Sequence, residues 1–78
     1  MPLIVKVINP DKILFDGSAE YVLAPGAKGV IGIMPSHTAM FVELIKGELY
    51  MKTDKEEIFP IESGILKIFN DEVTILIV

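Results

Sequence analysis

The sequence predicts an all-β fold, a flattened sandwich or barrel that forms one domain over residues 1–78. Turn-forming residues recur about every 8–12 residues, which is typical of sandwiches and barrels built from short strands. The segments between these turns are short and apolar, and several alternate with polar residues as half-buried strands do. No stretch sustains the i, i+3, i+4 and i+7 apolar pattern of an amphipathic helix between suitable caps.

The first half of the chain is expected to form four strands. These strands are expected at 3–8, 13–15, 19–24 and 30–34, with turns at Asn9-Pro10-Asp11, Asp16-Gly17, 25–29 and Pro35-Ser36-His37. Each turn contains Gly, Pro, Asn, Asp or Ser, which favour turns through their backbone preferences or local hydrogen bonds. Gly26, Gly29 and Gly32 are expected to serve turns or bulges with positive φ.

The second half is expected to form five more strands. These are expected at 40–45, 49–53, 58–61, 65–69 and 73–78, with turns at Lys46-Gly47, Thr53-Asp54-Lys55-Glu56, Ser63-Gly64 and Asn70-Asp71. Pro60 cannot donate to a strand ladder, so it places its strand at a sheet edge. The acidic residues around Lys55 are expected to form a solvated tip.

Composition points to a partner protein. A chain of 78 residues has a thin core, yet 51% of its residues are apolar and it has no cysteine. Disulfides and thiolate metal sites are therefore excluded. Apolar side chains in excess of the core are expected on the surface, where apolar patches mark contacts with other proteins.

Other classes of function are excluded by charge and patterning. The net charge is −4 and the basic residues are scattered lysines, so the concentrated basic face of a nucleic-acid-binding protein is missing. A membrane-spanning helix needs about 20 consecutive apolar residues, and no such run is present. The N-terminus also lacks the basic-then-apolar order of a secretory signal.

The chemistry-bearing motifs support a structural interpretation. His37 is the only histidine, and Ser36 beside it points away on an extended chain, so neither catalysis nor metal binding is expected. The glycines of 26–32 have the spacing of neither phosphate-binding motif, and Pro35 follows where a helix would be required. No catalytic residue, metal or cofactor is expected.

Three expected strands, 3–8, 40–45 and 73–78, have apolar residues on both faces. A two-layer sandwich buries only one face of each strand. Either a loop of the chain covers the second face, or a partner protein does.

The chain as a whole resembles the N-terminal domain of the ε subunit of F-type ATP synthases. The block Pro25-Gly26-Ala27-Lys28-Gly29-Val30-Ile31-Gly32-Ile33-Met34-Pro35-Ser36-His37 is similar to the family's P-G-x-x-G-x-x-G-I-x-P-G-H. The opening, with Asn9-Pro10 and then Phe15-Asp16-Gly17, also resembles the family, as do Lys46-Gly47 and Ser63-Gly64-Ile65-Leu66. Ser36 departs from the family glycine, and Val30 stands where many members carry an acidic residue.

The resemblance implies a ten-stranded sandwich that is a non-catalytic rotor subunit of the central stalk. It implies a peripheral position on the cytoplasmic face of a bacterial membrane, where the subunit couples proton or sodium translocation to ATP synthesis. The implied contact with the γ subunit uses His37, Thr38, Ala39, Met40 and Phe41. The implied contact with the c-ring uses Lys28, Gly29, Val30 and Ile31. The helical hairpin that follows this domain in most members is expected to be missing, and with it nucleotide binding and inhibition of hydrolysis.

A free-standing ligand-binding β-barrel is the alternative. It would hide a pocket of about 300 Å³ or more, whereas a rotor subunit would show an apolar patch on its outside.

Overall fold

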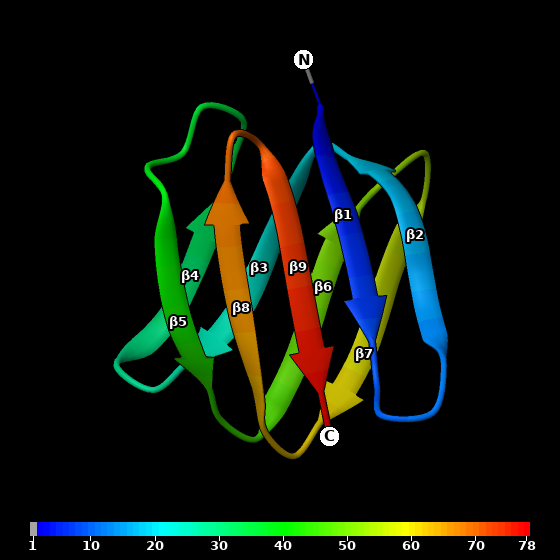
Figure 1. Cartoon of the computed structure of the whole chain (residues 1–78), viewed down its shortest axis with the longest axis vertical. Coiled ribbons are helices and arrows are strands. Elements are labelled where there is room, and N and C mark those ends of the chain that lie inside the picture. The colour runs from blue at the N-terminus through cyan, green and yellow to red at the C-terminus, as the bar shows by residue number, and fades with distance from the viewer. Residues whose placement is uncertain (1) are drawn as a thin grey trace.

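The computed structural model describes residues 2–78, which form strands and turns (Figure 1). The strands are β1 (Leu3–Ile8), β2 (Ile13–Ala19), β3 (Tyr21–Gly26), β4 (Gly29–Ile33), β5 (Met40–Leu44), β6 (Gly47–Lys52), β7 (Glu56–Ile61), β8 (Gly64–Phe69) and β9 (Glu72–Ile77). The all-β prediction is confirmed. Nine strands lie within the described residues, where the resemblance implied ten.

The strands form one sheet that folds over into two layers. The order is β2-β1-β9-β8-β5-β3-β6-β7, with β4 added beside β3. In Figure 1, β5, β8, β9, β1 and β2 form the front layer, and β4, β3, β6 and β7 lie behind them. The layers are joined where Gly26 of β3 pairs with Leu44 of β5. Every pairing is antiparallel except that of β1 with β9.

The core lies between the layers, and the strands that build most of it alternate between buried and exposed residues. In β9, for example, Val73, Ile75 and Ile77 are buried while the residues between them are exposed. This two-residue period is the one that a sheet with one dry face requires. The buried side chains are all apolar, and no buried side-chain nitrogen or oxygen of the described residues lacks a hydrogen-bond partner.

Several turn predictions are confirmed and others are wrong. Asn70 and Asp71 have φ of 51° and 60°, as the positive-φ residues of a tight hairpin do. Asp16-Gly17 does not end its strand, because β2 continues to Ala19 by pairing with β1. Residues 25–29 are not all loop either: Pro25 and Gly26 remain in β3, and Ala27-Lys28 alone turns the chain.

The three glycines of this region have different roles. Gly29 has a φ of 124°, which confirms the prediction for that position. Gly26 and Gly32 do not have positive φ, so the prediction is wrong for them. Gly26 is instead required by close approach, since a Cβ there would lie 2.8 Å from the Gly29 carbonyl oxygen. Gly32 pairs with Leu23 in a regular ladder.

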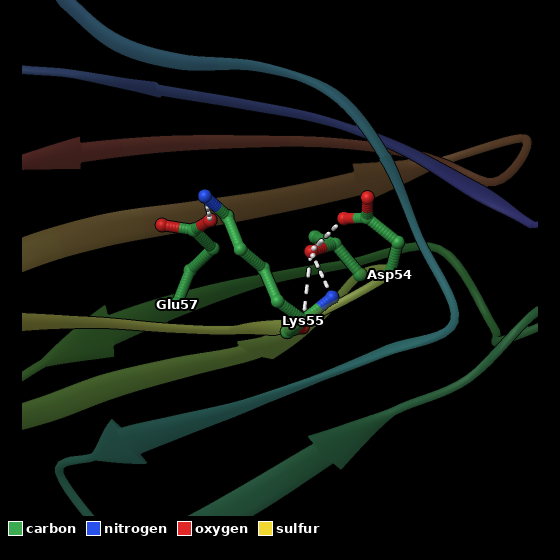
Figure 2. A network of polar contacts seen from close by, with 4 residues as sticks. Asp54, Lys55 and Glu57 are labelled. Carbon is green, nitrogen blue, oxygen red and sulfur yellow. Dashed lines mark hydrogen bonds and ion pairs between the residues drawn. The ribbon is translucent and has the colours of Figure 1, made fainter.

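The polar turn between β6 and β7 is a solvated tip, as predicted, since Asp54, Lys55 and Glu56 are exposed. Figure 2 shows the polar contacts of this turn. The Lys55 backbone N–H donates to Thr53 Oγ1 at 3.1 Å, and the Thr53 backbone N–H donates to the Lys55 carbonyl at 2.7 Å. Lys55 Nζ lies 3.8 Å from Glu57 Oε2 in an ion pair at the surface, with Lys55 exposed and Glu57 half-buried. Such a pair contributes little to stability. Pro60 lies on β7, the end of the sheet order, which confirms the edge prediction.

Candidate interaction surface

The loop that connects β4 to β5 holds His37 in a structural role. Ser36 has a φ of 69°, and its backbone N–H donates to Asp71 Oδ1 at 2.6 Å, which ties the loop to the β8–β9 turn. His37 is half-buried, and its Nδ1 lies 2.8 Å from the Thr38 carbonyl oxygen. Because a carbonyl only accepts, Nδ1 carries the proton and donates. This bond orients the imidazole along the loop.

The chain after His37 is exposed. Thr38 and Ala39 lie open to solvent, and they lead into β5, where Met40 is 40% exposed and Phe41 is 70% exposed. Phe41 pairs with Lys67 of β8 on the outer face of the front layer. An aromatic ring this exposed adds a large apolar area that the domain itself does not bury.

The outer face of the front layer continues the apolar surface that begins at Phe41. Ile65 of β8 pairs with Leu76 of β9, and Leu76 pairs with Ile8 of β1, so the three side chains form a row across the sheet. An open hollow of about 560 Å³ lies at the β5 end of this row. Its lining residues are Phe41, Glu43, Leu44, Ser63, Gly64, Ile65, Leu76 and Val78.

No loop of the described chain covers the second faces of the two-faced strands. Ile4 of β1 is 52% exposed and Leu76 of β9 is 38% exposed, in addition to Phe41 of β5. Of the two explanations that the sequence left open, cover by a loop is therefore wrong for residues 2–78.

The β3–β4 hairpin lies at the other end of the same side of the molecule. In Figure 1 its turn is at the lower left, while the β4–β5 loop is at the upper left. Lys28 and Gly29 are exposed, and Val30 is 74% exposed, whereas Ile31 packs partly against the core. The hairpin is held to β5, because the Ala27 N–H donates to the Glu43 carbonyl at 3.0 Å.

The two predicted contact regions meet along a seam between β4 and β5. An open hollow of about 420 Å³ there is lined by residues 26–31 from the hairpin and 40–43 from β5. Lys28–Ile31 are thus brought beside Met40 and Phe41, while His37, Thr38 and Ala39 do not line this hollow. Sequence reasoning treated the regions as separate because sequence distance does not show which strands face each other.

Sequence reasoning missed the outer face of the rear layer. Tyr21 and Tyr50 lie there with ring centroids 5.9 Å apart. The Tyr21 hydroxyl, then desolvation, then the Glu56 carboxylate raise the pKa of Tyr50 above its ordinary value, since each disfavours the phenolate. The alternation of 19–24 and 49–53 places both tyrosines on the outer faces of strands, but it does not show that those strands are neighbours.

The described residues were also compared with the requirements of a metal site, a membrane-spanning helix and an enclosed ligand pocket. Within residues 2–78, no three His, Cys, Asp or Glu side chains are grouped to hold a metal ion. Likewise, no helix in the described part of the chain is long and apolar enough to cross a bilayer. The hollows described above open to solvent, and the space between the layers is filled by side chains, which is unlike a ligand barrel with an enclosed pocket.

Comparison with known proteins identifies the family. Residues 2–77 match the β-sandwich domain of the ATP synthase delta/epsilon chain. The chain belongs to this family. The resemblance carried by the block from Pro25 to His37 is thereby confirmed.

Members of the delta/epsilon family with curated names support the match. The ATP synthase epsilon chain of Brevibacillus brevis is 38% identical over 74 residues, covering 92% of this chain and 56% of the relative. That of Prochlorococcus marinus is 36% identical over 78 residues, covering 99% of this chain and 58% of the relative. The chain therefore spans a little over half the length of the curated relatives it matches.

Solved structures show the same sandwich. A chain of the Euglena gracilis mitochondrial ATP synthase superposes with a TM-score of 0.91 at 16% identity, covering 97% of this chain and 50% of that one. A chain of the Tetrahymena thermophila central stalk and c-ring assembly superposes with a TM-score of 0.86 at 15% identity, covering 99% and 63%. At these identities the likeness shows that the fold is shared, and no more.

Proposed function

We propose that this domain is a non-catalytic part of the central stalk of an F-type ATP synthase. In this role it joins the γ subunit to the c-ring, so that proton or sodium translocation is coupled to ATP synthesis. The observation that carries the proposal, beside family membership, is the uncovered apolar surface at Met40, Phe41, Ile65 and Leu76. Burying such large apolar side chains against a partner protein is favourable, and exposed apolar patches of this kind mark protein contacts.

The γ subunit contacts the surface formed by His37, Thr38, Ala39, Met40 and Phe41. Exposed apolar side chains of β5 supply the contact area, and the ordered His37 loop presents them with little loss of entropy on binding. As part of the rotor, the domain lies peripherally at the cytoplasmic face of a bacterial membrane. It holds no cofactor in this role.

The c-ring contacts the β3–β4 hairpin through Lys28, Gly29, Val30 and Ile31. Loops and hairpin tips project from the ends of a sandwich and are common binding elements. Lys28 gives this tip a positive charge, and Val30 gives it an exposed apolar side chain.

Cysteine crosslinking tests the c-ring contact. The chain has no natural cysteine, so Lys28→Cys and Val30→Cys each introduce a unique thiol. We expect both to form disulfides with cysteines placed in the c-ring loops when the assembled complex is oxidised. Asp54→Cys is the control, because the β6–β7 turn lies at the opposite end of the sandwich (Figure 1). Crosslinking from Asp54→Cys alone would refute the placement.

Reconstitution tests the function itself. Residues 1–78 are added to ATP synthase depleted of its ε subunit and returned to liposomes, and ATP synthesis driven by an ion gradient is measured. We expect synthesis to rise well above that of the depleted complex. Synthesis that stays at the depleted level, together with no binding of the domain to the complex, would contradict the proposal.

A further inference from the structure

The loop that connects β4 to β5 is tied to the rest of the domain at one point. It spans residues 34–39 and is the longest connection between strands of the described chain. Such loops are usually the more mobile parts of a fold. Among the hydrogen bonds of residues 2–78, only the one from the Ser36 N–H to Asp71 Oδ1, at 2.6 Å, joins residues 35–38 to another element. The position of this loop therefore depends on Asp71.

Asp71 can serve as an anchor because its own backbone is fixed. It lies in the two-residue turn between β8 and β9, across which Phe69 pairs with Glu72. Its carbonyl oxygen accepts a hydrogen bond from the Ile4 N–H at the start of β1, at 2.9 Å. The backbone of Asp71 is thus bound to β1, while its side chain is bound to the β4–β5 loop.

The conformation of Ser36 makes this anchor necessary. Ser36 has a φ of 69°, in a region that is disfavoured for residues with a Cβ. Without the bond to Asp71, the backbone at Ser36 would also adopt the commoner conformations with negative φ. Each of these would turn the residues that follow in a different direction.

The residues that follow are part of the proposed γ contact. His37 donates from Nδ1 only to the neighbouring Thr38 carbonyl, so this bond orders the loop internally and does not attach it to the sheet. The β5 part of the contact is fixed independently, because Met40 already pairs with Ile68 of β8. The bond between Ser36 and Asp71 therefore controls residues 37–39 and leaves β5 in place.

We propose that Asp71 is a positioning residue for the γ contact. Its carboxylate oxygen holds Ser36 in the left-handed conformation, so that residues 37–39 are ordered before γ binds. Asp71 does not itself touch γ, and it acts by reducing the entropy that the loop loses on binding. The inference rests on the proposed function, in which this loop contacts γ, and it adds the residue that prepares the loop for that contact.

Three substitutions in the β8–β9 turn separate the hydrogen bond from other effects. Asp71→Gly removes the acceptor, and glycine adopts positive φ without strain. Asp71→Asn keeps an acceptor oxygen and removes the charge, and asparagine also tolerates positive φ. Asn70→Gly is the matched control, because it places a glycine in the same turn, at a φ of 51°, and leaves Asp71 intact.

The probe is F1 that contains γ and is depleted of ε, and the measured quantity is the Kd of each variant. We expect Asp71→Gly to bind about fivefold more weakly than the wild type, the effect of losing about one hydrogen bond. Asp71→Asn and Asn70→Gly should each bind within about twofold of the wild type. Circular dichroism verifies that each variant is folded. Wild-type affinity of Asp71→Gly, or an equal loss in either of the other two variants, overturns the inference.

A double-mutant cycle with His37→Ala tests whether Asp71 acts through the loop. His37 has the largest side chain of residues 37–39. If Asp71 acts by positioning that side chain, Asp71→Gly should weaken binding by about twofold or less once His37 is alanine. The same fivefold loss with and without His37 would mean that the two residues act independently, which contradicts positioning.

Amide hydrogen exchange of the free wild-type chain gives a readout that requires no variant to fold. The Ser36 amide donates to Asp71, whereas the Thr38 amide donates to no acceptor among residues 2–78. Relative to their intrinsic rates, Ser36 should exchange at least about tenfold more slowly than Thr38. Equal protection of the two amides overturns positioning by Asp71 while the proposed function stands. Failure of the wild-type chain to bind ε-depleted F1 overturns both.

Discussion

Replacing Leu66 with alanine should destabilise the domain by about 2–5 kcal/mol, the range for removing a large side chain from a packed core. Leu66 is fully buried in β8 between the layers. At roughly 0.05–0.15 kcal/mol per residue, the whole chain has a stability of only about 4–12 kcal/mol. The midpoint of thermal unfolding should therefore fall by about 10 °C or more, as measured by circular dichroism.

Ile65→Ala is the matched control for this effect. Ile65 is the next residue along β8 but points outward and is 40% exposed. Its truncation removes less buried area and leaves no cavity, so the loss should stay below about 1 kcal/mol. Equal losses from Leu66→Ala and Ile65→Ala would contradict the two-layer arrangement in which alternate residues of β8 face opposite sides.

Replacing Phe41 with glutamate should abolish co-purification with γ while leaving the isolated domain folded. Phe41 is 70% exposed, so a carboxylate there is solvated in the free domain. In the complex it would lose solvation without gaining a partner, and the aromatic contact would also be lost. We expect binding to depleted F1 to weaken at least about 30-fold, as for other aromatic hot spots.

Ile13→Glu provides the spatial control for Phe41→Glu. Ile13 is 56% exposed on β2, at the far edge of the same layer, so the variant adds the same charge away from the proposed contact. It should bind as the wild type does. Met40→Glu, as a separate variant, should also weaken binding to γ. If both β5 variants co-purify with γ unchanged, the contact surface lies elsewhere.

The sequence predicted strands correctly where turn-forming residues flank a segment and the segment itself alternates with a two-residue period. Asn70-Asp71 and Thr53-Asp54-Lys55 mark turns that the structure contains, and the apolar residues of 73–78 alternate as β9 does. The wrong turn predictions arise where a residue's own turn preference was used without knowing which strand it pairs with. Gly17 stays in β2 because it pairs with Val5, and Pro25 stays in β3 because it pairs with Val30. Pairing of this kind is a contact between segments, which local propensity does not report.

By itself the sequence determined the all-β class, the family and the presence of surplus apolar surface. These follow from local turn residues, a two-residue period and an ordered set of motifs, all of which are properties of neighbouring residues. Only the tertiary structure decided that Lys28–Ile31 and Met40–Phe41 line one seam. It also decided that β4, among the strands of residues 2–78, pairs with β3 alone and leaves its other edge free. The reason is physical: which strands become neighbours depends on how the layers pack around a shared core, and that packing involves the whole chain at once.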